Sequence, residues 1–189
     1  MRVIFLGTPA CGVPYLATLD ELGAEVVAVI TQPDRPGGRG RTLCAPPVKL
    51  AALERSWCVL QPPSCRDAAL LADLRALEPD LLLVVAFGQI LCPEFLALAR
   101  VAALNVHYSL LPQLRGAAPV AHALLQGLAE TGVTLQHLAP ELDAGDVVGQ
   151  ASLEIAPQDT AGTLTERLTK LGCELVRDLL PAVMAGTAP

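Results

Sequence analysis

Aromatic side chains are scarce in this sequence: Phe, Trp and Tyr together make up 3% of its 189 residues. The hydrophobic fraction is nevertheless 52%, so a core must be built from Leu, Val, Ile and Ala rather than from rings. A chain of this length and apolar content can bury a layered core and suits one α/β domain. We therefore expect a single domain over residues 1–189.

Long apolar runs are also lacking. The longest, Leu81–Phe87, is far below the roughly 20 residues that a membrane-spanning helix needs. The apolar run that opens the chain ends at Gly7-Thr8-Pro9, too early for a signal peptide. These two features predict a cytoplasmic protein without a membrane segment.

Several ligand-binding motifs are missing. The six cysteines form no C-x-x-C pair and no Cys/His cluster with metal-ligand spacing, so we expect no metal and small buried thiols. Gly7 and Gly12 have the spacing of P-loop glycines, but Val13-Pro14 stands where Lys-Ser/Thr is required. No G-x-G-x-x-G follows the first apolar run, which argues against nicotinamide dinucleotide binding.

Positive charge is scarce overall but concentrated at one point. The formal net charge of −6 argues against broad, non-specific binding of nucleic acid. However, Arg35, Arg39 and Arg41 lie together in a Gly-rich stretch. This stretch could contact RNA, or its arginines could simply be solvated on a loop.

Short apolar runs alternate with segments of helical periodicity along the first two thirds of the chain. The expected strands are 2–6, 25–30, 58–60, 80–87 and 103–107, and the expected helices are 13–22, 48–55, 67–77 and 118–127. Residues 31–47 are expected to form a loop. This order predicts an α/β fold with an open, twisted, mostly parallel sheet and helices on both faces.

The last third of the sequence has a different pattern. Paired strands at 132–138 and 147–155 are expected to flank an acidic loop at 141–146, and a long helix is expected at 163–185. In open α/β sheets, ligands gather at the carboxyl ends of strands. We therefore expect the active site in the loops that begin near Gly7, Thr31, Phe87 and His107.

The segment Asn105-Val106-His107 is the strongest candidate for chemistry. Residues two apart on a strand project to the same face, so an amide and an imidazole would lie side by side. Such a pair can stabilise an oxyanion and move a proton. The more common outcome for a buried histidine is structural, with its ring bonded to a backbone carbonyl.

A second candidate is the acidic segment Glu141-Leu142-Asp143-Ala144-Gly145-Asp146. It could be an ordinary solvated hairpin turn. Alternatively, one of its carboxylates could lie near His107 and fix the orientation of the imidazole.

Together these segments resemble the folate-dependent formyltransferases. The resemblance rests on Asn105-Val106-His107, Ser109-Leu110-Leu111-Pro112 and Leu142-Asp143-Ala144-Gly145-Asp146. It implies a Rossmann-like formyltransferase fold, 10-formyltetrahydrofolate as formyl donor, no metal, and a catalytic trio of Asn105, His107 and Asp143. It further implies a donor pocket lined by Phe87, Gly88, Gln89, Ile90, Leu91, Ser109, Leu110, Leu111, Pro112 and Leu138.

Three further stretches resemble the branch of that family that formylates methionyl initiator tRNA. They are Phe5-Leu6-Gly7-Thr8-Pro9, the stretch 31–41, and Arg115-Gly116-Ala117-Ala118-Pro119. The resemblance implies that Arg35, Arg39 and Arg41 contact the tRNA. It also implies that residues 1–189 form the catalytic domain, with the OB-like tRNA-binding domain beyond Pro189 absent from this chain. We also expect a monomer.

The sequence departs from the family pattern at Tyr108 and at Gln113, which would affect the loop beside the formyl group and a tRNA contact. The alternatives are another formyltransferase or a hydrolase that uses the same donor, and an inactive fragment that binds folate or tRNA.

Overall fold

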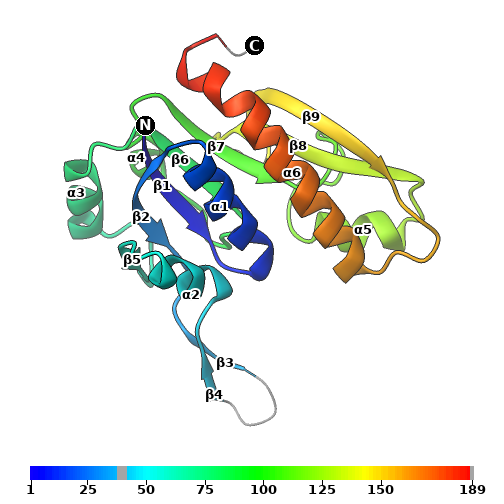
Figure 1. Cartoon of the computed structure of the whole chain (residues 1–189), viewed down its shortest axis with the longest axis horizontal. Coiled ribbons are helices and arrows are strands. Elements are labelled where there is room, and N and C mark those ends of the chain that lie inside the picture. The colour runs from blue at the N-terminus through cyan, green and yellow to red at the C-terminus, as the bar shows by residue number, and fades with distance from the viewer. Residues whose placement is uncertain (38–41, 188–189) are drawn as a thin grey trace. The chain divides into compact units, whose positions relative to one another are not determined.

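The computed structural model describes residues 1–37 and 42–187. The chain divides into two compact units, Met1–Arg100 and Val101–Pro189, called the first and the second unit below (Figure 1). That residues 1–189 act as one catalytic domain therefore stays a prediction.

The first unit is built on a parallel sheet. Its strands are β1 (Arg2–Gly7), β2 (Glu25–Ile30), β5 (Val59–Leu60) and β6 (Leu81–Val85), in the order β5-β2-β1-β6. β6 is buried along its whole length and β1 from Val3 onward. Parallel strands covered on both faces form continuous apolar runs, which is why these two were predictable from sequence.

Helices of the first unit follow its strands in the expected alternation. They are the 3-10 turn η1 (Ala10–Gly12), α1 (Val13–Glu21), α2 (Pro47–Glu54), α3 (Ala68–Ala76) and α4 (Pro93–Leu96). α1 buries Tyr15, Leu16 and Leu19, and it packs against α2 and β2. Prolines in the first turns of α1 and α2 cost nothing, because those N–H groups have no partner within a helix.

A small hairpin lies where the sequence predicted only a loop. Strand β3 (Arg35–Gly37) pairs antiparallel with β4 (Thr42–Cys44), so the prediction of a loop over 31–47 was wrong at these positions. The strands are short, exposed, and contain Pro36 and Gly37, residues that strands usually avoid and that an isolated two-stranded hairpin tolerates.

The second unit is antiparallel. Strands β7 (Ala102–His107), β8 (Glu130–His137) and β9 (Val147–Glu154) lie in the order β7-β8-β9. The pairing of β8 with β9 around the acidic loop was predicted, and α5 (Pro119–Leu125) differs from its predicted bounds only at its ends. Figure 1 shows α6 (Ala161–Met184) running along β8 and β9.

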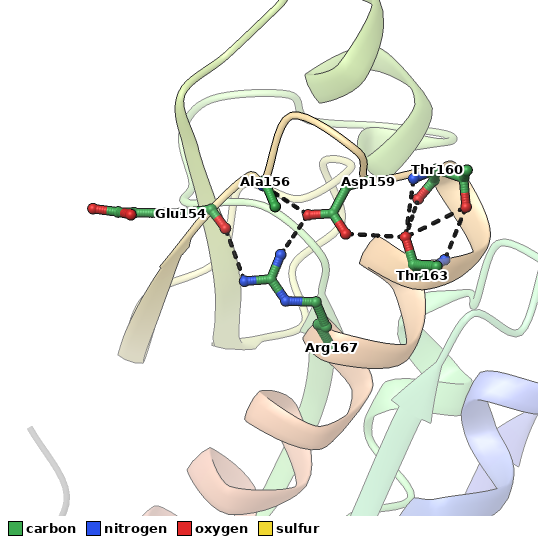
Figure 2. A network of polar contacts seen from close by, with 6 residues as sticks. All are labelled: Glu154, Ala156, Asp159, Thr160, Thr163 and Arg167. Atoms are coloured by element: carbon green, nitrogen blue, oxygen red, sulfur yellow. Dashed lines mark hydrogen bonds and ion pairs between the residues drawn. The ribbon is translucent and has the colours of Figure 1, made fainter.

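A polar network fixes the beginning of α6 (Figure 2). Thr160 caps the helix by accepting a hydrogen bond from the backbone N–H of Thr163. Asp159 accepts from the N–H of Ala156 at 2.8 Å and forms an ion pair with Arg167, whose guanidinium also donates to the carbonyl of Glu154. These bonds tie the helix to the end of β9.

Two predictions from composition can be compared with the structure. Within the described residues, no helix is long and apolar enough to cross a membrane. Burial of the thiols was predicted too broadly: Cys65 and Cys173 are buried, but Cys44 and Cys58 are exposed. Cys44 is exposed because it lies on the short hairpin and Cys58 because it immediately precedes the short strand β5, outside the apolar runs that form the core.

Candidate active site

Strand β7 presents Asn105 and His107 on one face, as their spacing predicted. Asn105 is half-buried and His107 is buried. In the antiparallel register, Asn105 lies opposite Gln136 of β8 and His107 lies opposite Thr134. The register therefore adds two polar side chains of β8 to the neighbourhood of the predicted pair.

The carboxylate of Asp143 is the centre of the cluster, and its side chain is only 9% exposed. Its Oδ1 accepts hydrogen bonds from Gln136 Nε2 at 3.0 Å and from Asn105 Nδ2 at 3.4 Å. Its Oδ2 accepts from the backbone N–H of Gly116 at 2.9 Å and lies 3.5 Å from His107 Nδ1. The acidic segment is therefore not merely a solvated turn.

His107 contacts an acceptor at each ring nitrogen. Nε2 lies 2.9 Å from the carbonyl oxygen of Leu114, and Nδ1 faces Asp143. Both interpretations of this histidine thus apply at once, since it is bonded to a backbone carbonyl and also paired with a carboxylate. A neutral imidazole can donate to only one of these two acceptors at a time, whereas the doubly protonated ring can donate to both.

Backbone strain is concentrated around these contacts. Asp143, Leu114 and Ala118 adopt the left-handed conformation, with φ values of 49°, 54° and 55°, although none is glycine. Such conformations cost about 1–3 kcal/mol each and persist where surrounding structure over-determines them. At Gly145 a Cβ atom would lie 1.8 Å from the carbonyl oxygen of His137, so the acidic loop needs a glycine there.

The segment Ser109–Pro112, predicted to line the donor pocket, is held by β8 and β9. Thr134 Oγ1 donates to the carbonyl of Ser109 at 2.6 Å and accepts from the N–H of Leu111. Gln150 Nε2 donates to the carbonyl of Leu111 at 2.9 Å, and the Leu111–Pro112 peptide is cis. Leu110 lies between the residues that these bonds fix.

The two departures from the family pattern have defined positions. The hydroxyl of Tyr108 lies 2.9 Å from Thr169 Oγ1 on α6, so its ring is directed to the helix rather than to Asp143. Gln113 is exposed and contributes its backbone carbonyl, which accepts from Ser109 Oγ at 2.6 Å.

The other residues predicted to line the pocket for the formyl donor are not part of this cluster. Leu138 follows the last residue of β8, and its backbone N–H donates to the carbonyl of Ala103 on β7. The segment 87–91 belongs to the first unit; there Phe87 is buried, Gly88 has φ +85°, and Ile90 is 73% exposed. That this segment and the trio share one pocket stays a prediction.

In the same segment, the side chain of Gln89 accepts from the N–H of Cys65 and donates to the carbonyl of Pro62, both at 3.2 Å. Leu91 is half-buried. These contacts fix the segment against its own unit.

Of the predicted tRNA-binding residues, Arg35 begins β3 and donates to Gln32 Oε1 at 2.9 Å. Arg39 and Arg41 lie outside the described residues. The arginine that can be assessed is thus bonded to its own chain at the base of the hairpin.

Sequence reasoning missed Gln136, Gly116 and Leu114 as partners of the trio. Gln136 was detectable as a polar residue inside an apolar strand, buried here at 1% exposure. Its Oε1 has no hydrogen-bond partner within the described part of the chain. A buried acceptor of this kind needs a donor from a ligand or water.

The cluster combines an amide donor, an imidazole and a buried carboxylate. This set can stabilise negative charge on an oxygen and carry a proton between two atoms of a substrate. Over residues 1–37 and 42–187, no group of three His, Cys, Asp or Glu side chains is placed to hold a metal ion. The amide, imidazole and carboxylate together suit group transfer at a carbonyl carbon.

Comparison with known proteins identifies the family. The model of the formyl transferase family matches residues 1–180. The chain belongs to the formyl transferase family.

Relatives within the formyl transferase family are close in sequence. The chain is 48% identical over 189 residues to methionyl-tRNA formyltransferase of Moorella thermoacetica, covering 100% of this chain and 61% of that protein. It is 50% identical over 185 residues to methionyl-tRNA formyltransferase of Listeria monocytogenes serotype 4a, covering 98% and 59%. The chain thus spans about three fifths of the length of these curated relatives.

Solved formyl transferases share the fold. Glycinamide ribonucleotide transformylase 1 from Symbiobacterium toebii matches with a TM-score of 0.81 at 21% identity, over 98% of this chain and 88% of that one. A sugar N-formyltransferase from a Shewanella species matches with a TM-score of 0.74 at 17% identity, over 100% and 72%. These likenesses confirm the α/β, Rossmann-like formyltransferase fold predicted from the sequence.

Proposed function

We propose that this chain transfers the formyl group of 10-formyltetrahydrofolate to the α-amino group of methionyl initiator tRNA. The observation that carries the proposal is the convergence of Asn105, His107, Gln136 and the Gly116 N–H on one buried carboxylate, that of Asp143. Identity of about one half to proteins named methionyl-tRNA formyltransferase supports the choice of acceptor.

Asn105 would act on the oxygen of the formyl group. The amine of the acceptor attacks the formyl carbon, a C–N bond forms, and negative charge develops on that oxygen. Asn105 has two amide N–H groups, of which one is directed to Asp143. The other can donate to the oxyanion, and one such donor contributes roughly 3–4 kcal/mol to transition-state stabilisation.

His107 would carry the proton. The attacking nitrogen loses a proton as the bond to N10 of the folate breaks, and N10 receives one. An imidazolium that is oriented by Asp143 and the carbonyl of Leu114 can supply a proton to N10 and then take one up from the attacking nitrogen. Asp143 would hold the ring and stabilise its charged form.

Substrate binding completes the proposal. Phe87–Leu91, Ser109–Pro112 and Leu138 would contact the folate, and Arg35, Arg39 and Arg41 would contact the tRNA. The sequence stretch that bears the arginines resembles a basic insertion, and lysine or arginine contacts to phosphate supply most non-specific affinity for nucleic acid. We further propose that the protein acts in the cytoplasm, where initiator tRNA is used, and that it is a monomer.

The test is a formyl-transfer assay with methionyl initiator tRNA and 10-formyltetrahydrofolate, comparing the wild-type chain with His107→Ala. His122→Ala is the matched control, because His122 is an exposed histidine of α5 in the same unit. We expect loss of product in the first variant and wild-type product in the second. Equal activity in all three proteins would refute the role of His107.

A second candidate is a related transferase or a hydrolase that uses the same donor with another acceptor. Its support is the fold, which is shared with a glycinamide ribonucleotide transformylase and a sugar N-formyltransferase. A panel of acceptors, namely water, amino sugars and methionyl-tRNA, distinguishes the candidates by the product formed. Donor binding without product from any acceptor would instead indicate an inactive binding fragment.

A further inference from the structure

Three neighbouring strands of the first unit end in residues that contact one another. Thr8 follows β1, Gln32 lies two residues after β2, and Phe87 lies two residues after β6. The carbonyl of Phe87 accepts two hydrogen bonds, from Thr8 Oγ1 at 2.9 Å and from Gln32 Nε2 at 3.3 Å. These side chains therefore determine how the turn at Phe87–Gly88 is oriented.

The oxygen of the Gln32 side-chain amide also has a hydrogen-bond partner. This oxygen, Oε1, accepts a hydrogen bond from the guanidinium of Arg35 at 2.9 Å. Gln32 is 8% exposed, whereas Arg35 is exposed and begins β3. One buried side chain thus joins the β3–β4 hairpin to the turn after β6.

The base of the hairpin is fixed from a second side. Lys49 Nζ donates to both oxygens of Asp34 and to Gln61 Oε1, at distances of 2.7–2.9 Å. Gln61 Nε2 in turn donates to the backbone carbonyl of Gln32 at 2.8 Å. Because the backbone of Gln32 is held in this way, its side chain has little freedom to release either partner.

We propose that Gln32 is a positioning residue, which orients the donor-binding turn through Phe87 and the acceptor-binding hairpin through Arg35. This inference rests on the proposed function, since it assigns the turn to the folate and the hairpin to the tRNA. It predicts that the two ends of one side chain serve two different substrates.

The variant Gln32→Glu changes the contact of this side chain with Phe87 and keeps its contact with Arg35. The replacement has the same shape and keeps an oxygen for Arg35, with a charge that strengthens that bond. It also places a carboxylate oxygen, which cannot donate, against the carbonyl of Phe87. We expect the Kd for 10-formyltetrahydrofolate to rise about tenfold, while the KM for methionyl-tRNA stays within threefold of wild type.

Two further variants test each end by itself. Thr8→Val removes the other donor to the Phe87 carbonyl and also the acceptor of the Gln32 N–H at 3.3 Å. Because the Gln61 amide still holds the Gln32 carbonyl, the donor Kd should rise severalfold while the KM for tRNA stays within threefold of wild type. Arg35→Met removes the partner of Gln32 at the hairpin and should leave the donor Kd unchanged. Because Arg35 is itself proposed to contact the tRNA, the rise in KM expected for this variant tests the hairpin as the acceptor site, and the unchanged donor Kd tests the independence of the two ends. Thermal melting of each variant checks that it is folded, and Thr8→Val replaces Gln32→Glu if the latter fails to fold.

The measurements are equilibrium binding of 10-formyltetrahydrofolate in the absence of acceptor, and steady-state kinetics with methionyl-tRNA. Donor Kd values within threefold of wild type for both Gln32→Glu and Thr8→Val would overturn the inference. An equal rise in donor Kd and tRNA KM in Gln32→Glu would also overturn it, because a general structural defect moves both. A wild-type chain that binds no donor would instead refute the proposed function itself.

Discussion

The two units place their polar side chains differently. In the first unit, β6 is apolar throughout and β1 is apolar from Val3 onward, and Thr8, Gln32 and the Phe87 turn come after the strands end. In the second unit, polar residues lie inside the antiparallel strands, with Asn105 in β7 opposite Gln136 in β8. The polar side chains of the first unit therefore lie at strand ends, and those of the second unit lie within strands.

This difference follows from how each sheet is covered. A parallel strand with helices on both faces has no solvated face, so polar groups can appear only where it stops. An antiparallel sheet can keep one face polar, and side chains on that face meet in cross-strand pairs. Under the proposed function, the second unit supplies the chemistry, and the first supplies stability and substrate positioning.

The largest predicted effect is in the second unit. Asp143→Ala removes the acceptor for Asn105 Nδ2, Gln136 Nε2 and the Gly116 N–H, so we expect kcat for formyl transfer to fall about a thousandfold. Asp146→Ala, at an exposed position in the same loop, should keep wild-type kcat. A fall of less than tenfold in Asp143→Ala would contradict the assignment of chemistry to this unit.

Next in size is a change inside a strand of the first unit. Leu83 is fully buried in β6, so Leu83→Ala should reduce the free energy of unfolding by about 2–5 kcal/mol. Chemical denaturation measures this loss. At a temperature where the variant is folded, kcat should stay within twofold of wild type, and a large fall would show that strand interiors of this unit also serve catalysis.

Gln136→Leu tests whether a single polar side chain within a strand of the second unit contributes to catalysis. Losing the amide that donates to Asp143 should reduce kcat about tenfold, since a hydrogen bond to a charged group is stronger than a neutral one. Thr131→Val is the control, because Thr131 is buried in the same strand outside the cluster. Equal kcat values for the two variants would remove Gln136 from the site.

The smallest expected effects are on stability in acid, and each unit contributes one. Hydrogen bonds from Lys49 and Gln61 lower the pKa of Asp34, and the Ala156 N–H and Thr163, together with Arg167, lower the pKa of Asp159. A lowered pKa contributes stability that is fully present above the unfolded value near 4 and is lost as pH falls through the folded value.

Melting temperatures measured from pH 7 to pH 2 check this prediction. Asp34→Asn and Asp159→Asn should each lower the melting temperature at pH 7 and make its fall below about pH 4 shallower. Asp178→Asn, an exposed position on α6, should leave the profile unchanged. Profiles parallel to wild type in both test variants would contradict the assigned pKa shifts.

Much of the fold could be predicted because its strands are distinct in composition. β6 is a continuous apolar run, and α6 has a long amphipathic repeat that begins at a capping threonine. The β3–β4 hairpin could not be predicted, because Pro36 and Gly37 are typical of turns and its strands are too short and exposed to show a pattern.

The candidate site was only partly predictable for a related reason. Asn105 and His107 share a face by the geometry of any strand, so their proximity was accessible from sequence. The position of Gln136 opposite Asn105 depends on the register between β7 and β8, which tertiary packing determines. The Leu114 carbonyl and the Gly116 N–H come from the backbone, which no residue type identifies.

The glycine at position 145 limits how this protein can change in length. The acidic loop is closed at one end by His137, whose carbonyl leaves no room for a Cβ atom, and Asp143 must still reach the Gly116 N–H. An insertion or deletion between 138 and 146 would withdraw the carboxylate even if every residue of the trio were retained. At Gly127 an added Cβ would meet nothing within 4 Å, so a substitution there is opposed by its φ of +62° and not by contact with a neighbour, and it leaves the carboxylate where it is.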